Sequence, residues 1–199
     1  MLAPEVQNNG VIIANLGTVA MASGETIELQ FNTGGALTGL RVSASTINAL
    51  VENKKAVQAP GGLIILSAQA MSKIRSGVVK NSGTLEAAGL ANRGGRIVLE
   101  ASTTVANSGT ISANAGVAQL GQEGGPAGTV SLNAPEVLQT GVIAANNTLP
   151  HASAVVQTGG QIDIQATTFT QSGGASLDVS SLVGAAGTVK VVASDSLSI

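Results

Sequence analysis

The chain of 199 residues has no cysteine, tryptophan or tyrosine and only two phenylalanines. Without cysteine it can form neither a disulfide framework nor a thiolate metal site. Two aromatic residues cannot supply the girdles of a membrane β-barrel, and no apolar run approaches the roughly 18–20 residues of a membrane-spanning helix, so we expect no membrane insertion. Charged residues make up only 10% of the chain, and the formal net charge is −2. Because nucleic-acid binding needs a strongly basic face or aromatic platforms, the composition also disfavours a nucleic-acid partner.

What remains is a chain rich in small and apolar residues. It contains 26 glycines, and 44% of its residues are hydrophobic, which excludes disorder caused by high charge and low hydrophobicity. The segment Met1–Pro4 has neither the basic nor the apolar region of a signal peptide. The repeat pattern described next runs into both ends of the sequence, so we interpret the chain as a piece of a longer protein.

Two short motifs recur along the chain. The first is Gly-x-apolar-x-apolar-x-Ala, with copies beginning at Gly62, Gly95, Gly128, Gly160 and Gly187, at spacings of 33, 33, 32 and 27 residues. The second is amide-hydroxyl-Gly, with its amides at Asn81, Asn107, Gln139 and Gln171. Apolar residues alternate with polar ones inside each copy, which is the period of a β-strand. Gly-punctuated short strands of this spacing are compatible with a sandwich, a propeller or a solenoid.

Stacking of similar residues favours the solenoid. Ile97, Val130, Ile162 and Val189 would form one inward column, and Leu99, Leu132, Ile164 and Val191 a second. A third would hold Ala101, Ala134, Ala166 and Ala193. A propeller blade would need four strands in about 40–45 residues and usually carries aromatic signatures. We therefore predict an all-β fold, a right-handed parallel β-helix, in which Phe169 shares a column with Val105 and Val137. The four amides would form a hydrogen-bonded ladder at one turn, and each following glycine would supply a positive φ.

Three insertions are predicted around this coil. The segments 25–31 and 37–42 read as an antiparallel hairpin outside the β-helix. Apolar residues at Ile47, Leu50 and Val51, after a cap at Ser45, predict a short helix over 45–53. Met71, Ile74 and Val78 indicate a second short helical turn. We divide the chain at residue 60, into 1–60 and the regular repeats of 61–199.

Several segments resemble the filamentous haemagglutinin family of large exoproteins secreted by the two-partner route. The segments that carry the resemblance are Leu16–Ile27, Ile47–Lys54, Val57–Gly62 and Val79–Ala87. The resemblance implies secretion through an outer-membrane TpsB-type transporter, a location at the bacterial cell surface, and a role as an adhesin. It also implies that 1–60 is the end of the amino-terminal secretion domain. The alternative within the same fold is the passive stalk of an exported toxin of the haemolysin or contact-dependent inhibition type.

The sequence contains few residues suited to catalysis or metal binding. The single histidine, His151, lies in a predicted loop, and the carboxylates are scattered, with Asp163 stacked between Ser131 and Lys190, and Glu100 stacked over Asn133 and Gln165. We therefore expect no catalytic site, no metal and no cofactor, and a polysaccharide-active β-helix enzyme is the disfavoured alternative. Loops such as 116–127 and 145–158 are expected at the surface. A basic group could contact an anionic host glycan: Lys54, Lys55, Lys73, Arg75 and Lys80. Exposed rung ends also make end-to-end self-association an expectation.

Overall fold

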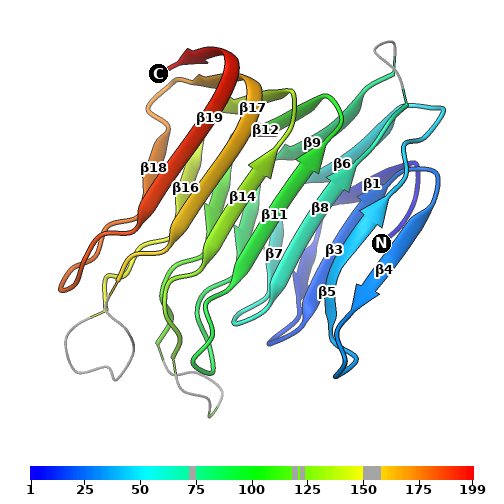
Figure 1. Cartoon of the computed structure of the whole chain (residues 1–199). Coiled ribbons are helices and arrows are strands. Elements are labelled where there is room, and N and C mark those ends of the chain that lie inside the picture. Colours follow the sequence, from blue (N-terminus) through cyan, green and yellow to red (C-terminus); the bar gives the residue numbers. More distant parts are fainter. Residues whose placement is uncertain (72–74, 118–120, 122–123, 150–157) are drawn as a thin grey trace.

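The computed structural model describes residues 1–71, 75–117, 121, 124–149 and 158–199, and these residues form a stack of parallel β-strands (Figure 1). Three strands make up most turns of the coil, one on each of three faces. Strands of successive turns pair in parallel and in chain order. The architecture is that of a parallel β-helix, as the repeats predict.

Face 1 and face 2 belong to one sheet and meet at a corner. Face 1 contains β3 (Thr18–Ser23), β8 (Leu63–Ala68), β11 (Arg96–Ala101) and β14 (Thr129–Asn133). Face 2 contains β1 (Glu5–Asn8), β6 (Ala49–Asn53), β9 (Gly77–Asn81), β12 (Thr104–Asn107) and β15 (Glu136–Gln139). The two long strands β17 (Gln161–Gln171) and β19 (Thr188–Ser198) run across the corner, so β17 pairs first with β14 and then with β15.

Face 3 is a separate sheet of short strands. It contains β2 (Val11–Ile13), β7 (Ala56–Gln58), β10 (Thr84–Glu86), β13 (Thr110–Ser112), β16 (Val142–Ala144) and β18 (Ser176–Asp178). The remaining two strands, β4 (Ile27–Phe31) and β5 (Leu37–Val42), form the predicted antiparallel hairpin, which lies outside the coil (Figure 1).

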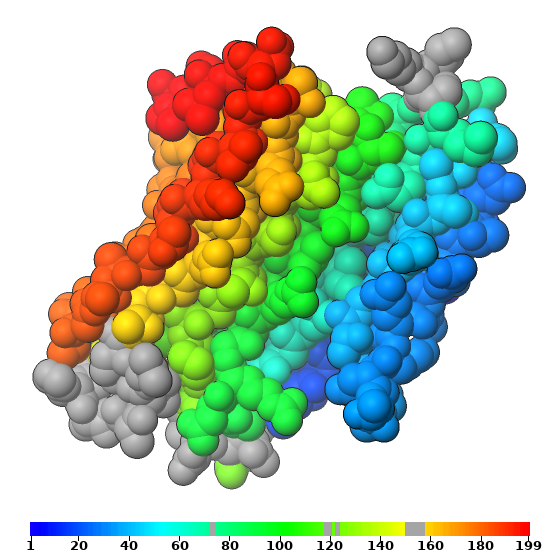
Figure 2. Space-filling model, viewed as in Figure 1, coloured from blue at the N-terminus to red at the C-terminus, as the bar shows by residue number. Residues whose placement is uncertain are grey.

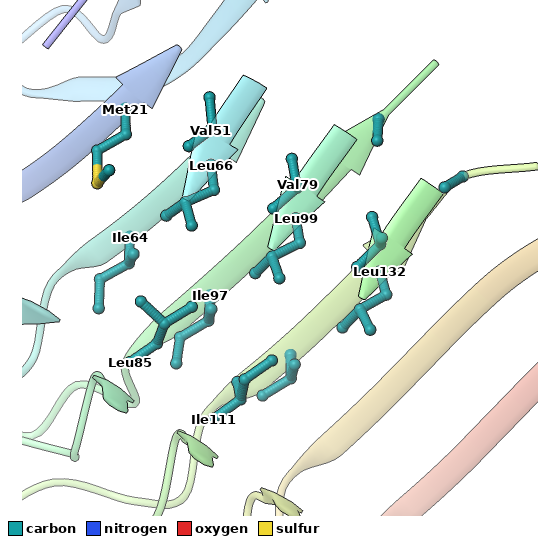
Figure 3. Close-up of a cluster of buried hydrophobic side chains, with 14 of the residues drawn as sticks. Met21, Val51, Ile64, Leu66, Val79, Leu85, Ile97, Leu99, Ile111 and Leu132 are labelled. Carbon is teal, nitrogen blue, oxygen red and sulfur yellow. The ribbon is translucent and has the colours of Figure 1, made fainter. Parts of the chain in front are cut away.

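The core is a set of aligned apolar columns inside the coil. The register pairs Ile97 with Val130 and Leu99 with Leu132, which confirms the predicted stacking. Figure 3 shows Leu66, Leu99 and Leu132 on neighbouring strands of face 1, with Val51 and Val79 beside them from face 2. Phe169 is fully buried in the column of Val105 and Val137, also as predicted. Alternating inward side chains on three faces fill the lumen, and Phe169 is the one aromatic residue in this core among the described residues.

The predicted helix over 45–53 is wrong, and the described part of the chain contains no helix. Residues 49–53 form β6, whose side chains alternate, so Val51 is fully buried and Leu50 is turned outward. Ser45 does accept a hydrogen bond from the backbone N–H of Ile47, at 3.2 Å, but the turn leads into a strand. Pairing with β1 on one side and β9 on the other overrides the helix-like spacing, because tertiary context outweighs local propensity. In the second segment Val78 lies in β9, and Ile74 lies outside the described residues.

The glycines of the amide-hydroxyl-Gly motif are required for a reason other than the predicted positive φ. Gly83, Gly109 and Gly141 do not have positive φ angles. Instead, a Cβ on Gly109 would overlap the carbonyl oxygen of Gly83 in the turn below, and a Cβ on Gly141 would overlap that of Gly109. Only in the last motif, at Gly173, is φ positive, at 68°. Close approach of stacked backbones therefore selects glycine at this corner.

This steric requirement predicts different costs for the same substitution at two equivalent corners. We expect Gly109→Ala to destabilise the chain by about 2–3 kcal/mol, the order of magnitude of overpacking a tight interior. Gly10 occupies the same corner in the first turn, where a Cβ would meet no atom closer than Asn8 Oδ1 at 4.0 Å, so Gly10→Ala serves as the matched control. Chemical denaturation followed by circular dichroism measures both variants. Equal losses of stability would contradict the steric explanation.

Candidate functional site

Most of the longer loops of the coil lie at one edge. The connections from face 3 to face 1 span 14–17, 59–62, 87–95, 113–128, 145–160 and 179–187, whereas those from face 2 to face 3 are two residues long until the last turn. Figure 1 shows the longer connections at one end of the face 1 strands. Leu182, in the loop 179–187, is 67% exposed. Connecting loops vary more freely than strands and often carry binding residues, which makes this edge one candidate interaction surface.

The basic residues singled out in the sequence are only partly brought together. Lys54 and Lys55 form the turn between β6 and β7, and Lys80 lies on β9 beside them, in register with Glu52. Lys54 Nζ is 3.2 Å from Glu52 Oε2 and donates a hydrogen bond to Gln7 Oε1, also at 3.2 Å.

Arg75 precedes β9 at the opposite corner of the coil, and Lys73 lies outside the described residues. Three of the five basic residues therefore share one corner, where a carboxylate already pairs with one of them.

The amide residues form a buried column at the corner between faces 2 and 3. Each side-chain N–H donates to the amide oxygen of the next turn: Asn8 to Asn53, Asn53 to Asn81 and Asn81 to Asn107 at 2.8 Å, and Asn107 to Gln139 at 3.0 Å. Asn53, Asn81, Asn107 and Gln139 are at most 1% exposed. The sequence did not reveal Asn53 as a member of the ladder, because Asn53 lacks the Ser-Gly sequence that defined the motif. The column has a structural role, because its side-chain amides hydrogen-bond to one another.

The ladder is interrupted at its last predicted member. The side chain of Gln139 donates to Gly141 O at 2.9 Å, and that of Gln171 donates to Ala175 O at 3.1 Å. The Oε1 atom of Gln171 is buried and has no hydrogen-bond partner among the described residues. The longer glutamine side chain reaches its own turn, so it does not bridge to its neighbour.

A second polar cluster lies at the end of face 3. Asn146 donates to Asp178 Oδ2 at 2.7 Å, and the backbone N–H of Ser180 donates to Asp178 Oδ1 at 2.9 Å. The hydrogen bonds from Asn146 and then from Ser180 lower the pKa of Asp178 below its ordinary value. These bonds tie the start of the loop 179–187 to the turn below.

The described carboxylates are spread along the coil. Asp163 pairs in register with Ser131 and Lys190, and the column of Glu100, Asn133 and Gln165 is also as predicted. On its other side Glu100 pairs with Ser67. Among the described residues no three histidine, cysteine, aspartate or glutamate side chains come close enough to hold a metal ion. His151 lies outside the described residues.

A groove that the sequence did not reveal lies beside the hairpin. Two adjoining cavities of about 260 and 290 Å³ share Thr38, Leu63 and Arg96, and one of them reaches Val98 and Glu100. Figure 2 shows the hairpin, in blue, standing out from the face of the cyan and green strands. Two signals were available, Ile65 and Val98, which are apolar residues at outward positions of β8 and β11; both line the groove, and Ile65 is only 5% exposed. The antiparallel hairpin itself was predicted, but its packing on face 1 was not.

In the part of the chain that the structure describes, no helix is long and apolar enough to cross a membrane. No family model matches the chain, and no curated protein matches it. Geometry and repeat sequence are therefore the basis of the functional proposal below.

The amide ladder predicts a large and pH-dependent cost for one isosteric change. Asn81→Asp removes the side-chain NH2 group that donates to Asn107 Oδ1 and Thr110 O, and it buries a carboxylate. We therefore expect the free energy of unfolding to fall by about 3 kcal/mol at neutral pH. Burial raises the folded-state pKa of the introduced carboxyl, so the deficit should shrink below about pH 4, where the group is neutral and can donate. Urea denaturation at both pH values measures this. The control, Ser82→Ala at an exposed neighbour, should change little.

The Asp178 cluster predicts the direction of a titration shift. Because the folded-state pKa is lowered, the charged carboxylate stabilises the fold above the unfolded value of about 3.9, and this contribution is lost as the pH falls through the folded pKa. Asn146→Ala removes the largest cause, so the pKa of Asp178 should rise. Carbon-detected NMR titration of the carboxyl measures it. Asn133→Ala, at an exposed asparagine on face 1, is the control, and an unchanged pKa in Asn146→Ala would refute the assignment.

Proposed function

We propose that this chain is a non-catalytic section of the shaft of a large secreted exoprotein that acts as an adhesin at the bacterial surface. One observation carries the proposal: strand pairing is continuous on all three faces, while most of the longer connections lie at one edge of the coil, in addition to the hairpin and the connection 69–76. A shaft needs the first property, and the display of binding loops needs the second. The described residues offer no cluster of acids or histidines that would favour an enzyme.

The stacked strands support the mechanical part of this function. In a solenoid each turn contacts mainly its neighbours, so turns can be added without changing the fold. The buried amide column adds a hydrogen bond between most successive turns, in a place where no water competes. Such a rod holds its loops at fixed spacing and at a distance from the membrane to which it is attached.

The finer features of the proposal rest on general rules and on the family resemblance. We propose right-handed winding, because connections between parallel strands of one sheet are right-handed in about 98% of cases. The resemblance supports two-partner export through a TpsB-type outer-membrane transporter, and it supports assigning 1–60 to the end of a secretion domain and 61–199 to fibre rungs. Pairing of β3 with β8 carries the sheet across residue 60 without a break.

Binding to a host glycan is the first test of the adhesin. We expect saturable binding of the purified, folded chain on a glycan array or on host cells. If the ligand is an anionic glycan held at the Lys54–Lys55 turn, then Lys54→Ala with Lys55→Ala should reduce binding about tenfold, and Lys190→Ala on the far turn should not. If the loop edge binds instead, replacing 180–186 by a short Gly-Ser turn should abolish it.

The same measurement separates the alternatives. A chain that is folded by circular dichroism but binds no glycan or cell would contradict the adhesin proposal and would favour the passive stalk of an exported toxin. Release of reducing sugars from a polysaccharide would contradict the non-catalytic assignment.

A further inference from the structure

The groove beside the hairpin is lined by a regular pattern of side chains. Arg96, Val98 and Glu100 are alternate residues of β11, so all three point outward on the same face of the strand. The floor continues onto β8 through Leu63 and Ile65. The pattern along the strand is therefore a cation, an apolar residue and an anion, spread over roughly 13 Å between the first and the last Cα.

The two charged side chains are not used by the fold. Among the residues that the structure describes, the one ion pair joins Lys54 to Glu52, and neither Arg96 nor Glu100 makes a side-chain hydrogen bond there. Glu100 is partly buried in the groove and has no hydrogen-bond or ion-pair partner among the described residues. A charge in that position is better satisfied by a ligand than by the protein itself.

The hairpin supplies the opposite wall. Leu37 O accepts a hydrogen bond from Thr18 Oγ1, at 3.1 Å, which anchors β5 to face 1. Thr38, Leu40 and Gln30 then line the groove across from β11. The wall thus presents one apolar side chain and an exposed amide, both suited to the side chains and backbone of an extended ligand.

The same face carries no such pattern away from the hairpin. The outward residues of β14 are Thr129, Ser131 and Asn133, and no strand covers them. Charge, apolar floor and covering wall therefore coincide only beside the hairpin within the described residues. Shielding of Ile65 explains the hairpin's contact with β8, but it does not explain the unpaired charges on β11.

We propose that this groove binds an extended peptide segment with an acidic, an apolar and a basic side chain at alternating positions. The acidic side chain meets Arg96, the apolar one lies over Val98, and the basic one meets Glu100. An extended peptide repeats its side chains with the same period of two residues as β11, so the three contacts form together. The site is independent of the glycan-binding role proposed above.

Isothermal titration calorimetry with capped pentapeptides tests the proposal. The probes are Asp-Thr-Val-Thr-Lys and two like-charged controls, Asp-Thr-Val-Thr-Asp and Lys-Thr-Val-Thr-Lys. We expect the first to bind at least tenfold more tightly than either control, because in both controls one charge faces a like charge. Reversing the peptide is no control, since it can lie in the groove in either direction.

Charge reversal in the protein should reverse the preference. Arg96→Glu should favour the Lys/Lys peptide, and Glu100→Arg the Asp/Asp peptide, each by about tenfold. Val98→Trp should fill the groove and weaken all three peptides. Lys190→Glu, on the same sheet but away from the hairpin, is the control and should leave the order unchanged. Circular dichroism and the melting temperature check that each variant is folded.

Failure of the Asp/Lys peptide to bind the folded chain at millimolar concentration would overturn the proposal. So would equal affinity for all three peptides, or a preference that does not follow the charge of residues 96 and 100. None of these results bears on glycan binding at the loop edge.

Discussion

The close stacking of successive turns is the constraint on which the rest of this structure depends. Parallel strands about 4.8 Å apart pair their backbones from one turn to the next. At the corner between faces 2 and 3 the backbones approach so closely that a Cβ on Gly83, Gly109 or Gly141 would overlap a carbonyl oxygen below. The same spacing lets each amide of the buried ladder reach the next. A side chain in this coil is therefore chosen by what lies directly above and below it.

This constraint also decides where the chain can vary. A two-residue corner pinned by a glycine and a buried amide leaves no room for an insertion, because a longer turn would pull the ladder apart. The last turn illustrates this. Its connection, 172–175, has four residues instead of two, and φ is positive at Gly173 and Gly174. There the side chain of Gln171 donates a hydrogen bond within its own turn instead of joining the ladder. The corner between faces 3 and 1 has no continuous ladder of buried side-chain amides among the described residues, and most of the long connections occur there.

The sequence was sufficient to predict the repeating inward columns of the core. The columns through Ile97, Leu99 and Phe169 follow from residue spacing, because inward positions of a solenoid must match from turn to turn. It was insufficient where local and long-range preferences disagree. Residues 45–53 have helical spacing, yet β6 must fill the place between β1 and β9. The groove was not predictable either, since it depends on how the hairpin packs against strands that follow it in the chain.

The hairpin and the loop edge place chemistry on the outside of the rod in different ways. A loop adds residues whose conformation is set by few contacts, so it can change without cost to the core. The hairpin instead packs beside a regular strand surface. On that surface β11 presents Arg96, Val98 and Glu100 at fixed intervals, and the hairpin forms the opposite wall of a groove along this row. Because the rod fixes the spacing of these side chains, the proposed site would recognise a ligand by the spacing of its own side chains. An extended peptide has that period, and a compact sugar ring does not.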